Sequence, residues 1–292
     1  MYILLNSAEP PKVEQSQTIS GRLGDFSGVG QLVGKVAVIG VPLDENSSFM
    51  RGPALAPPRI REALHSGASN LCAENGVDLA SSWQDVGDLA LASGADSFTQ
   101  IEQAMDELLA RGARVLSLGG DHSITYPILR AYAIKYPRLN ILHLDAHPDL
   151  YDEFEGNRRS HACPFARIMQ ERLAERLVQV GIRTMNPHQR EQAERFGVEV
   201  IEMREWPASL KFDGPLYVSL DLDALDPAFA PGVSHHEPGG LSTREVLSII
   251  QNTPATLVGA DIVEFNPARD PVGVTAAVAA KFYKELVARM LR

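Results

Sequence analysis

The sequence predicts an α/β protein built on a mostly parallel β-sheet. From residue 35 onward, short apolar runs rich in β-branched residues alternate with segments of helical periodicity. Runs that are apolar throughout suit the strands of a parallel sheet, because such a sheet is covered on both faces. Strands and helices that alternate along the chain form βαβ units, so a mostly parallel sheet is expected.

The first half of the chain contains the clearest element boundaries. Val36–Val41 is a β-branched run typical of a buried strand. Pro57 and Pro58 precede a helix, since proline is tolerated in the first helical turn. Ser97 is a favourable N-cap for the following helix. The same reasoning predicts strands at 36–41, 115–118, 141–144, 177–180, 198–201, 216–220 and 257–263, and helices at 59–64, 97–110, 123–135, 164–175, 187–196, 243–250 and 276–290.

The domain organisation follows from the length and from the absence of a linker. At about 150 residues per domain, 292 residues would form two domains, but single α/β domains of about 250 residues are common. The sequence contains no internal repeat, low-complexity tract or linker-like segment. We therefore expect one domain over residues 1–292, with residues 1–34 as a polar N-terminal arm.

Composition limits the partners and the compartment. The net charge of −10 argues against nucleic acid, which requires a basic face. No apolar run approaches the roughly 18 residues that cross a bilayer, and the N-terminal apolar stretch is too short for a secretory signal. Cys72 and Cys163 have no metal-binding spacing, so we interpret them as reduced thiols, with a catalytic Cys163 as the alternative. We expect a cytoplasmic protein with no nucleic-acid or membrane partner.

Three predicted strands break into acidic residues and histidines at their carboxyl ends, where ligands bind in open parallel sheets. Strand side chains alternate between faces, so residues two apart converge on one side. Gly119 and Gly120 precede the first break, and we expect this glycine pair to provide the tight turn that points His122 inward. The polar residues at the three breaks are Asp121 and His122, then Asp145, His147 and Asp149, then Asp221, Asp223 and Asp226.

Carboxylates gathered in one crevice would repel each other strongly, and bound cations remove that cost. Oxygen and imidazole ligands without a thiolate favour Mn²⁺, and six side-chain ligands exceed what one small ion usually takes. A two-metal site of this kind generates hydroxide at neutral pH. We interpret Asp121, His143 and Asp226 as structural or supporting residues. The predicted ligands of two Mn²⁺ ions are His122, Asp145, His147, Asp149, Asp221 and Asp223.

These segments resemble the metal motifs of the ureohydrolases, the family of arginase, agmatinase and their relatives. The family motifs are Gly-Gly-Asp-His, Asp-Ala-His-x-Asp and Asp-x-Asp, in the order found here. The chain is most similar to plant-type arginases, through segments 46–62, 145–162, 226–235 and 259–267. The resemblance implies a three-layer α/β/α fold with an eight-stranded parallel sheet, and a homo-oligomer that is a trimer or a hexamer.

The resemblance also implies the roles of individual residues. Asp145 and Asp221 would bridge the two manganese ions, His161 would move protons near the leaving amine, and Glu264 would pair with the substrate guanidinium. A carboxylate can bind a planar guanidinium through two parallel hydrogen bonds, and an imidazole suits proton transfer. The expected reaction is hydrolysis of a guanidinium group to urea and an amine, with Asp149 or His161 passing the proton.

The motifs predict a small cationic guanidino substrate, but they do not identify the groups at the end of the substrate that is remote from the guanidinium. We expect L-arginine, cleaved to urea and L-ornithine, with agmatine or another guanidino acid as the alternative. We expect the loop 152–161 to recognise the remote end of the substrate, with Asn157 and Ser160 as substrate contacts. Two other classes compete with this interpretation: an amidohydrolase similar to histone deacetylases with a single zinc ion, and an inactive scaffold homologue.

Overall fold

Eight parallel strands form one sheet in the computed structural model, which describes residue 26 and residues 29–292. The strand order is β2-β1-β3-β8-β7-β4-β5-β6. This sheet confirms the expected fold class; most of the arm expected at 1–34 lies outside the described residues. The strands are β1 (Val36–Val41), β2 (Trp83–Asp88), β3 (Arg114–Gly119), β4 (Asn140–Leu144), β5 (Arg176–Ile182), β6 (Glu199–Glu202), β7 (Pro215–Asp221) and β8 (Thr256–Val263).

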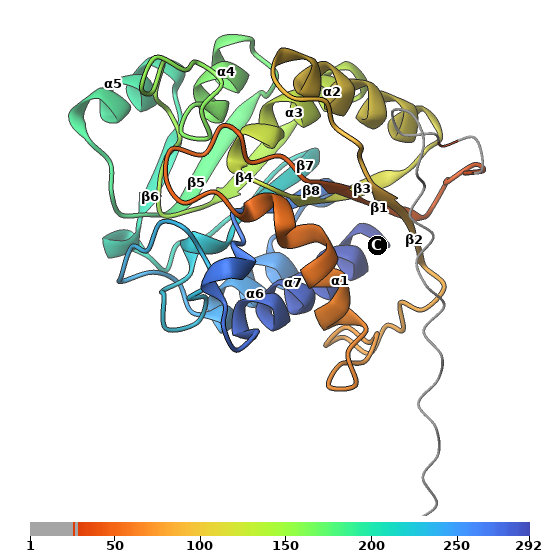
Figure 1. Cartoon of the computed structure of the whole chain (residues 1–292). Helices are drawn as coiled ribbons and strands as arrows, with labels where there is room; N and C mark the ends of the chain where they lie inside the picture. Colours follow the sequence, from red (N-terminus) through yellow and green to blue (C-terminus); the bar gives the residue numbers. More distant parts are fainter. Residues whose placement is uncertain (1–25, 27–28) are drawn as a thin grey trace, which may run out of the picture.

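Helices cover both faces of the sheet and complete the three layers (Figure 1). An apolar cluster lies on each face, with Ile101 and Ile128 fully buried in one and Ile60 and Leu286 in the other. One helical layer contains α2 (Ala95–Ala110), α3 (Thr125–Lys135), α4 (Pro164–Gln170) and α5 (Pro187–Phe196), and the other contains α1 (Ala56–Leu64), α6 (Thr243–Asn252) and α7 (Val274–Met290).

Strand β2 is the one strand that the residue pattern does not predict. Its sequence, Trp83–Asp88, is polar, and Val86 is its only buried residue. An edge strand pairs on one side only, so it does not need the continuous apolar run that marks a central strand. Arg61 of α1 holds β2 through ion pairs with Asp85 and Asp88.

Helix α4 ends at Gln170, five residues before the predicted end. Arg172 has a φ of 56°, in the left-handed region, which a right-handed helix cannot contain. The apolar periodicity continues through Leu173, but the backbone has already turned towards β5.

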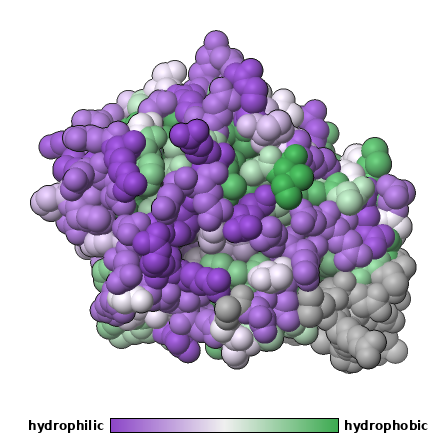
Figure 2. Space-filling model, turned by 90° about the horizontal axis from the view of Figure 1, so that it is seen from above, coloured by the Kyte–Doolittle hydropathy of each residue, from purple (hydrophilic) through white to green (hydrophobic). Residues whose placement is uncertain are grey.

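The surface seen from the top of Figure 1 is mainly hydrophilic, with small scattered hydrophobic areas (Figure 2). Among the described residues, no helix combines the length and the apolar character needed to span a bilayer.

Candidate metal centre and active-site cavity

Four neighbouring strands, β3, β8, β7 and β4, bring the three polar segments together at their carboxyl ends. The chain visits these strands in the order β3, β4, β7, β8, so residues far apart in the sequence become neighbours in the sheet. Strand β3 leads to His122, β4 to Asp145, His147 and Asp149, β7 to Asp221 and Asp223, and β8 to Glu264.

The first group of predicted ligands surrounds the imidazole of His122. Its Nδ1 atom lies 3.2 Å from one carboxylate oxygen of each of Asp145, Asp149 and Asp221. This nitrogen is buried and makes no hydrogen bond within the described part of the chain. Ligand atoms at right angles, each about 2.1 Å from an ion, lie about 3.0 Å apart. The four atoms therefore fit the coordination shell of one divalent cation.

The second group surrounds His147. Its Nδ1 atom lies 3.1 Å from Oδ2 of Asp223 and 3.4 Å from Oδ1 of Asp145. Asp145 thus offers Oδ2 to the first group and Oδ1 to the second, which suits a bridging ligand. Asp221 offers Oδ2 to the first group, and its Oδ1 accepts the N–H of Asp223 at 2.8 Å, just as Oδ1 of Asp145 accepts the N–H of His147 at 2.6 Å. No histidine nitrogen of the second group lies against Oδ1 of Asp221 in the described residues. A second bridge through Asp221 stays a prediction.

Burial makes these carboxylates unfavourable without a cation. Burial and the neighbouring Asp145 raise the pKa of Asp149 to about 6. Burial, with Asp223 and Asp145 nearby, raises the pKa of Asp221 well above its usual value. Divalent cations would offset the repulsion and hold the carboxylates ionised.

His143 supports Asp145 rather than completing a metal shell, although its ring lies close enough to be a ligand. Its Nε2 lies 2.7 Å from Oδ2 of Asp145, and its Nδ1 lies 2.9 Å from Nε2 of Gln179, which can donate to it. Burial lowers the pKa of His143 to about 4, so the ring is neutral at pH 7. Both ring nitrogens are therefore engaged in orienting the carboxylate.

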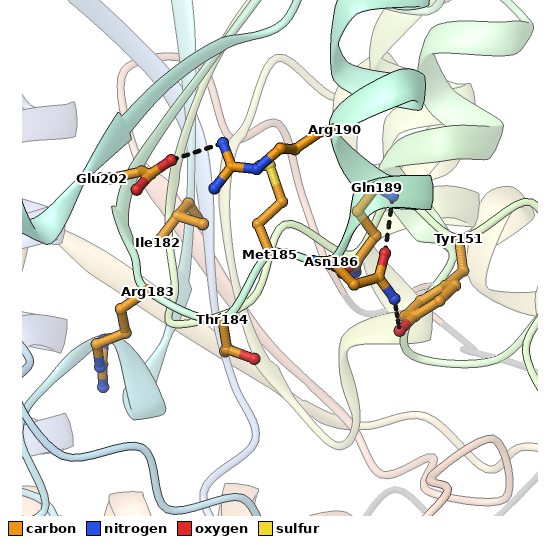
Figure 3. Close-up of a pocket in the computed structure, with 9 residues that line it drawn as sticks. All are labelled: Tyr151, Ile182, Arg183, Thr184, Met185, Asn186, Gln189, Arg190 and Glu202. Carbon is orange, nitrogen blue, oxygen red and sulfur yellow. Dashed lines mark hydrogen bonds and ion pairs between the residues drawn. The ribbon is translucent and has the colours of Figure 1, made fainter.

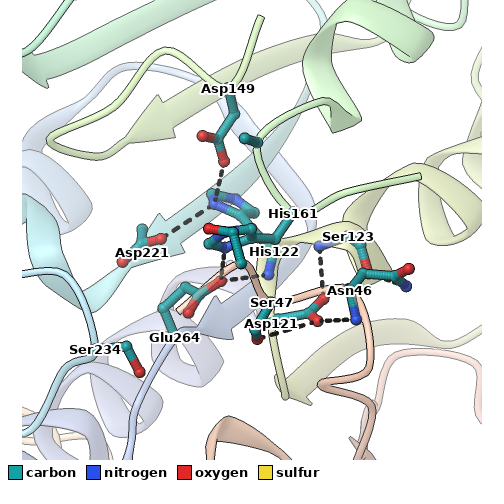
Figure 4. A network of polar contacts seen from close by, with 12 residues as sticks. Asn46, Ser47, Asp121, His122, Ser123, Asp149, His161, Asp221, Ser234 and Glu264 are labelled. Carbon is teal, nitrogen blue, oxygen red and sulfur yellow. Dashed lines mark hydrogen bonds and ion pairs between the residues drawn. The ribbon is translucent and has the colours of Figure 1, made fainter. Parts of the chain in front are cut away.

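Beside the two groups of predicted metal ligands, Glu264 and His161 form a buried pair (Figure 4). Oε1 of Glu264 lies 2.8 Å from Nδ1 of His161 and accepts the backbone N–H of His122 at 2.9 Å. Nε2 of His161 lies 2.9 Å from Oγ of Ser48. Burial lowers the pKa of His161, but the Glu264 carboxylate outweighs it and raises that pKa to about 9. His161 is therefore protonated at neutral pH.

Asp121 anchors the loop that carries Ser48. Its carboxylate accepts the backbone N–H of Asn46 at 3.0 Å and the hydroxyl of Ser47 at 3.3 Å (Figure 4). Asn46 in turn accepts the backbone N–H of His161 at 3.2 Å. Asp121 thus acts as the supporting residue that the sequence suggests. Ser48 lies in a segment that carries the resemblance, but its contact with His161 depends on tertiary structure.

The backbone is strained at two site residues. Asp149 has a φ of 49° and Glu264 a φ of 62°, both in the left-handed region that residues other than glycine rarely adopt. Such strain is concentrated at functional sites. Gly120, by contrast, does not have a left-handed φ. A Cβ atom there would lie 1.8 Å from the carbonyl oxygen of Leu43, so this glycine permits close backbone approach rather than the predicted tight turn.

A cavity of about 160 Å³ opens onto both groups of predicted ligands. A second cavity of about 300 Å³ adjoins it (Figure 3). Tyr151, Thr184 and Gln189 line both cavities. The first is lined by Ser48, His147, Asp149, Tyr151, Phe154, His161, Ala162, Thr184, Gln189, Asp221, Asp223, His235 and Glu264.

Asn157 and Ser160, the expected substrate contacts, do not line this cavity. The Asn157 amide donates to Oδ1 of Asn46 at 3.2 Å, and the buried Ser160 hydroxyl accepts the N–H of Ala162 at 3.3 Å. Their polar groups stabilise the loop itself. Phe154 and His161 are the residues of the loop 152–161 that line the cavity, together with Tyr151, Thr184 and Gln189 from outside it. Sequence spacing alone does not reveal which side of a loop faces a cavity.

The two cysteines are free thiols. Cys163 is fully buried, and burial raises its pKa to about 12. A thiolate is the reactive form of cysteine, so this environment argues against the catalytic alternative for Cys163.

Comparison with known proteins identifies the family. Residues 34–288 match the model of the arginase family. Arginase 1, mitochondrial, of Arabidopsis thaliana is 49% identical over 283 residues, covering 90% of this chain and 83% of that protein. Guanidino acid hydrolase, mitochondrial, of Homo sapiens is 37% identical over 271 residues, covering 86% and 77%. The solved arginase from Medicago truncatula has a TM-score of 0.85 at 44% identity, covering 91% of this chain and 90% of that one.

The expected cytoplasmic location is wrong on this comparison. Similar arginases from Arabidopsis thaliana, rice and Medicago truncatula are named mitochondrial, and one is named chloroplastic/mitochondrial. The expectation rested on a missing secretory signal. Import into organelles uses segments of a different kind, amphipathic and rich in arginine and serine, so that argument does not bear on it.

The matching family model and the similar arginases exclude the histone-deacetylase-like alternative. They support a hydrolase acting on guanidino compounds. The chain belongs to the arginase family.

Proposed function

We propose that the protein is a binuclear manganese arginase, which hydrolyses L-arginine to L-ornithine and urea. The observation that carries this proposal is the pair of ligand groups that share Asp145 and lie beside Glu264 and His161 at one cavity. We further propose that residues 1–292 act as one ureohydrolase domain and assemble as a homotrimer or homohexamer.

The six predicted ligands would hold two Mn²⁺ ions, with Asp145 shared between them. Four carboxylates and two imidazoles form a mixed oxygen and nitrogen set that suits this fairly hard cation. When bound, such a pair of ions supplies a nucleophilic hydroxide at neutral pH and stabilises developing negative charge.

Glu264 would orient the guanidinium. Its Oε1 is fixed by His122 and His161, and its Oε2 has no hydrogen bond among the described residues, so one oxygen is free to accept an N–H of the substrate. A charged carboxylate at this position would be complementary to the planar cation. The strained backbone of Glu264 fits a residue held in place for such a function.

His161 would hold the proton for the leaving nitrogen. It lines the cavity and carries a proton at neutral pH because Glu264 raises its pKa to about 9. Asp149 is the alternative donor, but an aspartate that holds a metal ion has no proton to give. Oγ of Ser48 fixes Nε2 of the ring and thus the direction of the N–H bond.

The far wall of the cavity favours a substrate with an α-carboxylate. Tyr151, Thr184 and Gln189 are uncharged residues with hydroxyl or amide donors. Oε1 of Gln189 accepts the N–H of Asn186, while its Nε2 donates to no partner among the described residues. Donors of this kind suit the carboxylate of arginine, whereas agmatine has no group for them to bind.

The test is urea release by the manganese-loaded protein, with arginine and agmatine supplied separately at equal concentration. Urea from arginine, with ornithine as the co-product, supports the proposal. Urea mainly from agmatine would keep the metal chemistry and overturn the substrate. Metal analysis of the same sample should give two manganese ions per chain; a single zinc ion, with activity independent of manganese, would overturn the proposed centre.

A further inference from the structure

His235 lies in the active-site cavity without a role in the proposed reaction. Its ring centroid is 5.1 Å from that of His161, 5.8 Å from that of His147 and 5.7 Å from that of Phe49. Within the described chain, neither ring nitrogen makes a hydrogen bond.

Two further donor groups converge on this ring. Nitrogen atoms of His161 and His235 and a carboxylate oxygen of Glu264 all lie within 4.8 Å of one another. None of these three residues is among the six predicted manganese ligands. Nδ1 of His161 is the nitrogen beside Glu264, at 2.8 Å, and Oγ of Ser48 holds the opposite nitrogen at 2.9 Å. Histidine ligands of metal ions usually have such a partner on the second nitrogen.

We propose that His161, His235 and Glu264 form a third, inhibitory metal site that binds Zn²⁺. Two imidazoles and one carboxylate are a common zinc set, in which three protein ligands leave one position open. Zinc would displace the proton that His161 carries in its absence, because a metal ion binds only the neutral imidazole. Zinc binds nitrogen and oxygen ligands more tightly than manganese does, so it can occupy this site at concentrations far below those of manganese.

The inhibition rests on the proposed function, because it assumes that Glu264 binds the guanidinium. Zinc held by Glu264 would neutralise the carboxylate that the substrate needs, and its charge would repel the cationic guanidinium. Zinc and substrate would therefore exclude each other. Zinc should raise the apparent KM and leave kcat unchanged.

The chain provides a matched control in the next residue. Nε2 of His236 lies 2.7 Å from the carbonyl oxygen of Pro231, and its ring is exposed and does not line the cavity. His235→Ala removes the proposed ligand, and His235→Gln removes it while keeping a polar side chain of similar length. His236→Ala removes an imidazole one position along the same loop.

The experiment uses the full chain loaded with manganese and kept in excess manganese. Zinc is titrated by equilibrium dialysis, both metals are measured by elemental analysis, and urea release is followed in parallel. We expect the wild type and His236→Ala to bind one zinc ion per chain while retaining two manganese ions. Loss of even an outer partner of a metal site weakens binding roughly 10–100-fold, so His235→Ala and His235→Gln should weaken zinc binding at least about tenfold.

The inhibition constant of zinc is determined for each variant, with every rate expressed relative to the rate of the same variant without zinc. Zinc uptake matched by manganese release would place zinc in the binuclear centre and overturn the proposal. Equal zinc affinity in His235→Ala and His236→Ala would overturn it as well. Zinc binding that depends on His235, in a protein that releases no urea from any guanidino compound, would support the site and contradict the proposed function instead.

Discussion

Glu264 combines three properties at the scale of a single residue. It has a left-handed backbone, its Oε1 accepts the N–H of His122, and it forms the buried pair with His161. Most of these properties depend on contacts across the sheet. The position of Glu264 just after an apolar strand is visible in the sequence, and so is the convergence of alternating ligands such as Asp145 and His147. The contact partners are not, since Ser48 and His235 reach the cavity from distant loops.

Replacing Glu264 with glutamine tests the guanidinium contact. Glu264→Gln should retain both metals, because Glu264 is not a predicted ligand. KM should rise about tenfold or more, since hydrogen bonds to charged groups contribute roughly 1.5–3 kcal/mol. Steady-state kinetics and metal analysis measure both quantities; an unchanged KM would remove Glu264 from the substrate site.

The same variant should shift the pH dependence. Loss of the proton from His161 removes the proton donor, so activity should fall as pH rises through its pKa. The carboxylate of Glu264 raises that pKa, and the neutral amide would not. The alkaline limb of the kcat profile should therefore move to lower pH in Glu264→Gln. A shift in the opposite direction would contradict the assignment of His161 as the acid.

Asp223→Ala should remove one metal ion and most activity. Its Oδ2 lies 3.1 Å from Nδ1 of His147, within the second group of predicted ligands. Asp226→Ala is the control, because Asp226 accepts backbone N–H groups of Ala228 and Gly239 and lies outside both groups. Elemental analysis should find fewer metal ions only in Asp223→Ala; two retained manganese ions would refute its role as a ligand.

Ser48→Ala tests the orientation of the His161 ring. Loss of one hydrogen bond, worth about 0.5–1.5 kcal/mol, should lower kcat about two- to tenfold and leave KM nearly unchanged. Ser48→Thr keeps the hydroxyl and should restore kcat. Ser47→Ala is the matched control, since Ser47 contacts Asp121 instead. Equal effects of Ser47→Ala and Ser48→Ala on kcat would indicate a general loop effect.

At the scale of elements, the sequence predicts the central strands and the edge strand β6 (Glu199–Glu202), but not the edge strand β2. Strands β3, β4, β7 and β8 are buried on both faces, and their continuous apolar runs predict them. Strand β2 has one buried residue, so its sequence has no apolar run that marks a strand. Its parallel pairing with β1 holds it in the sheet instead. Local patterns reveal burial, whereas the pairing of a mainly polar strand such as β2 depends on the neighbouring strand.

The junction between β3 and His122 should tolerate no added carbon at Gly120. A Cβ atom in Gly120→Ala would meet the backbone of Leu43, which cannot move aside as a flexible side chain could. Overpacking of this kind typically costs about 1–3 kcal/mol. Gly67→Ala is the control, because a Cβ atom there meets nothing within 4 Å. Thermal unfolding should show a loss of stability for Gly120→Ala alone; equal Tm values would contradict the close approach.

At the scale of the whole molecule, the metal centre joins strands from both halves of the sheet. Metal bound only to the folded state adds about 2.7 kcal/mol at a hundred times its Kd. Chelation should therefore lower the Tm, and added manganese should restore it in proportion to the logarithm of its concentration. Differential scanning calorimetry measures both effects, with Asp223→Ala as the variant that should gain less. A Tm independent of manganese would contradict a centre that bridges the sheet.

The position of β8 has a consequence for synthesis of the chain on the ribosome. All six predicted ligands precede β8 in the sequence, yet β8 lies between β3 and β7 in the sheet. A nascent chain that ends before Thr256 already contains every ligand, but the strand that sets the spacing between His122 and Asp221 does not yet exist. Metal capture should therefore follow translation of the last strand, and the ions would be acquired by a nearly finished protein.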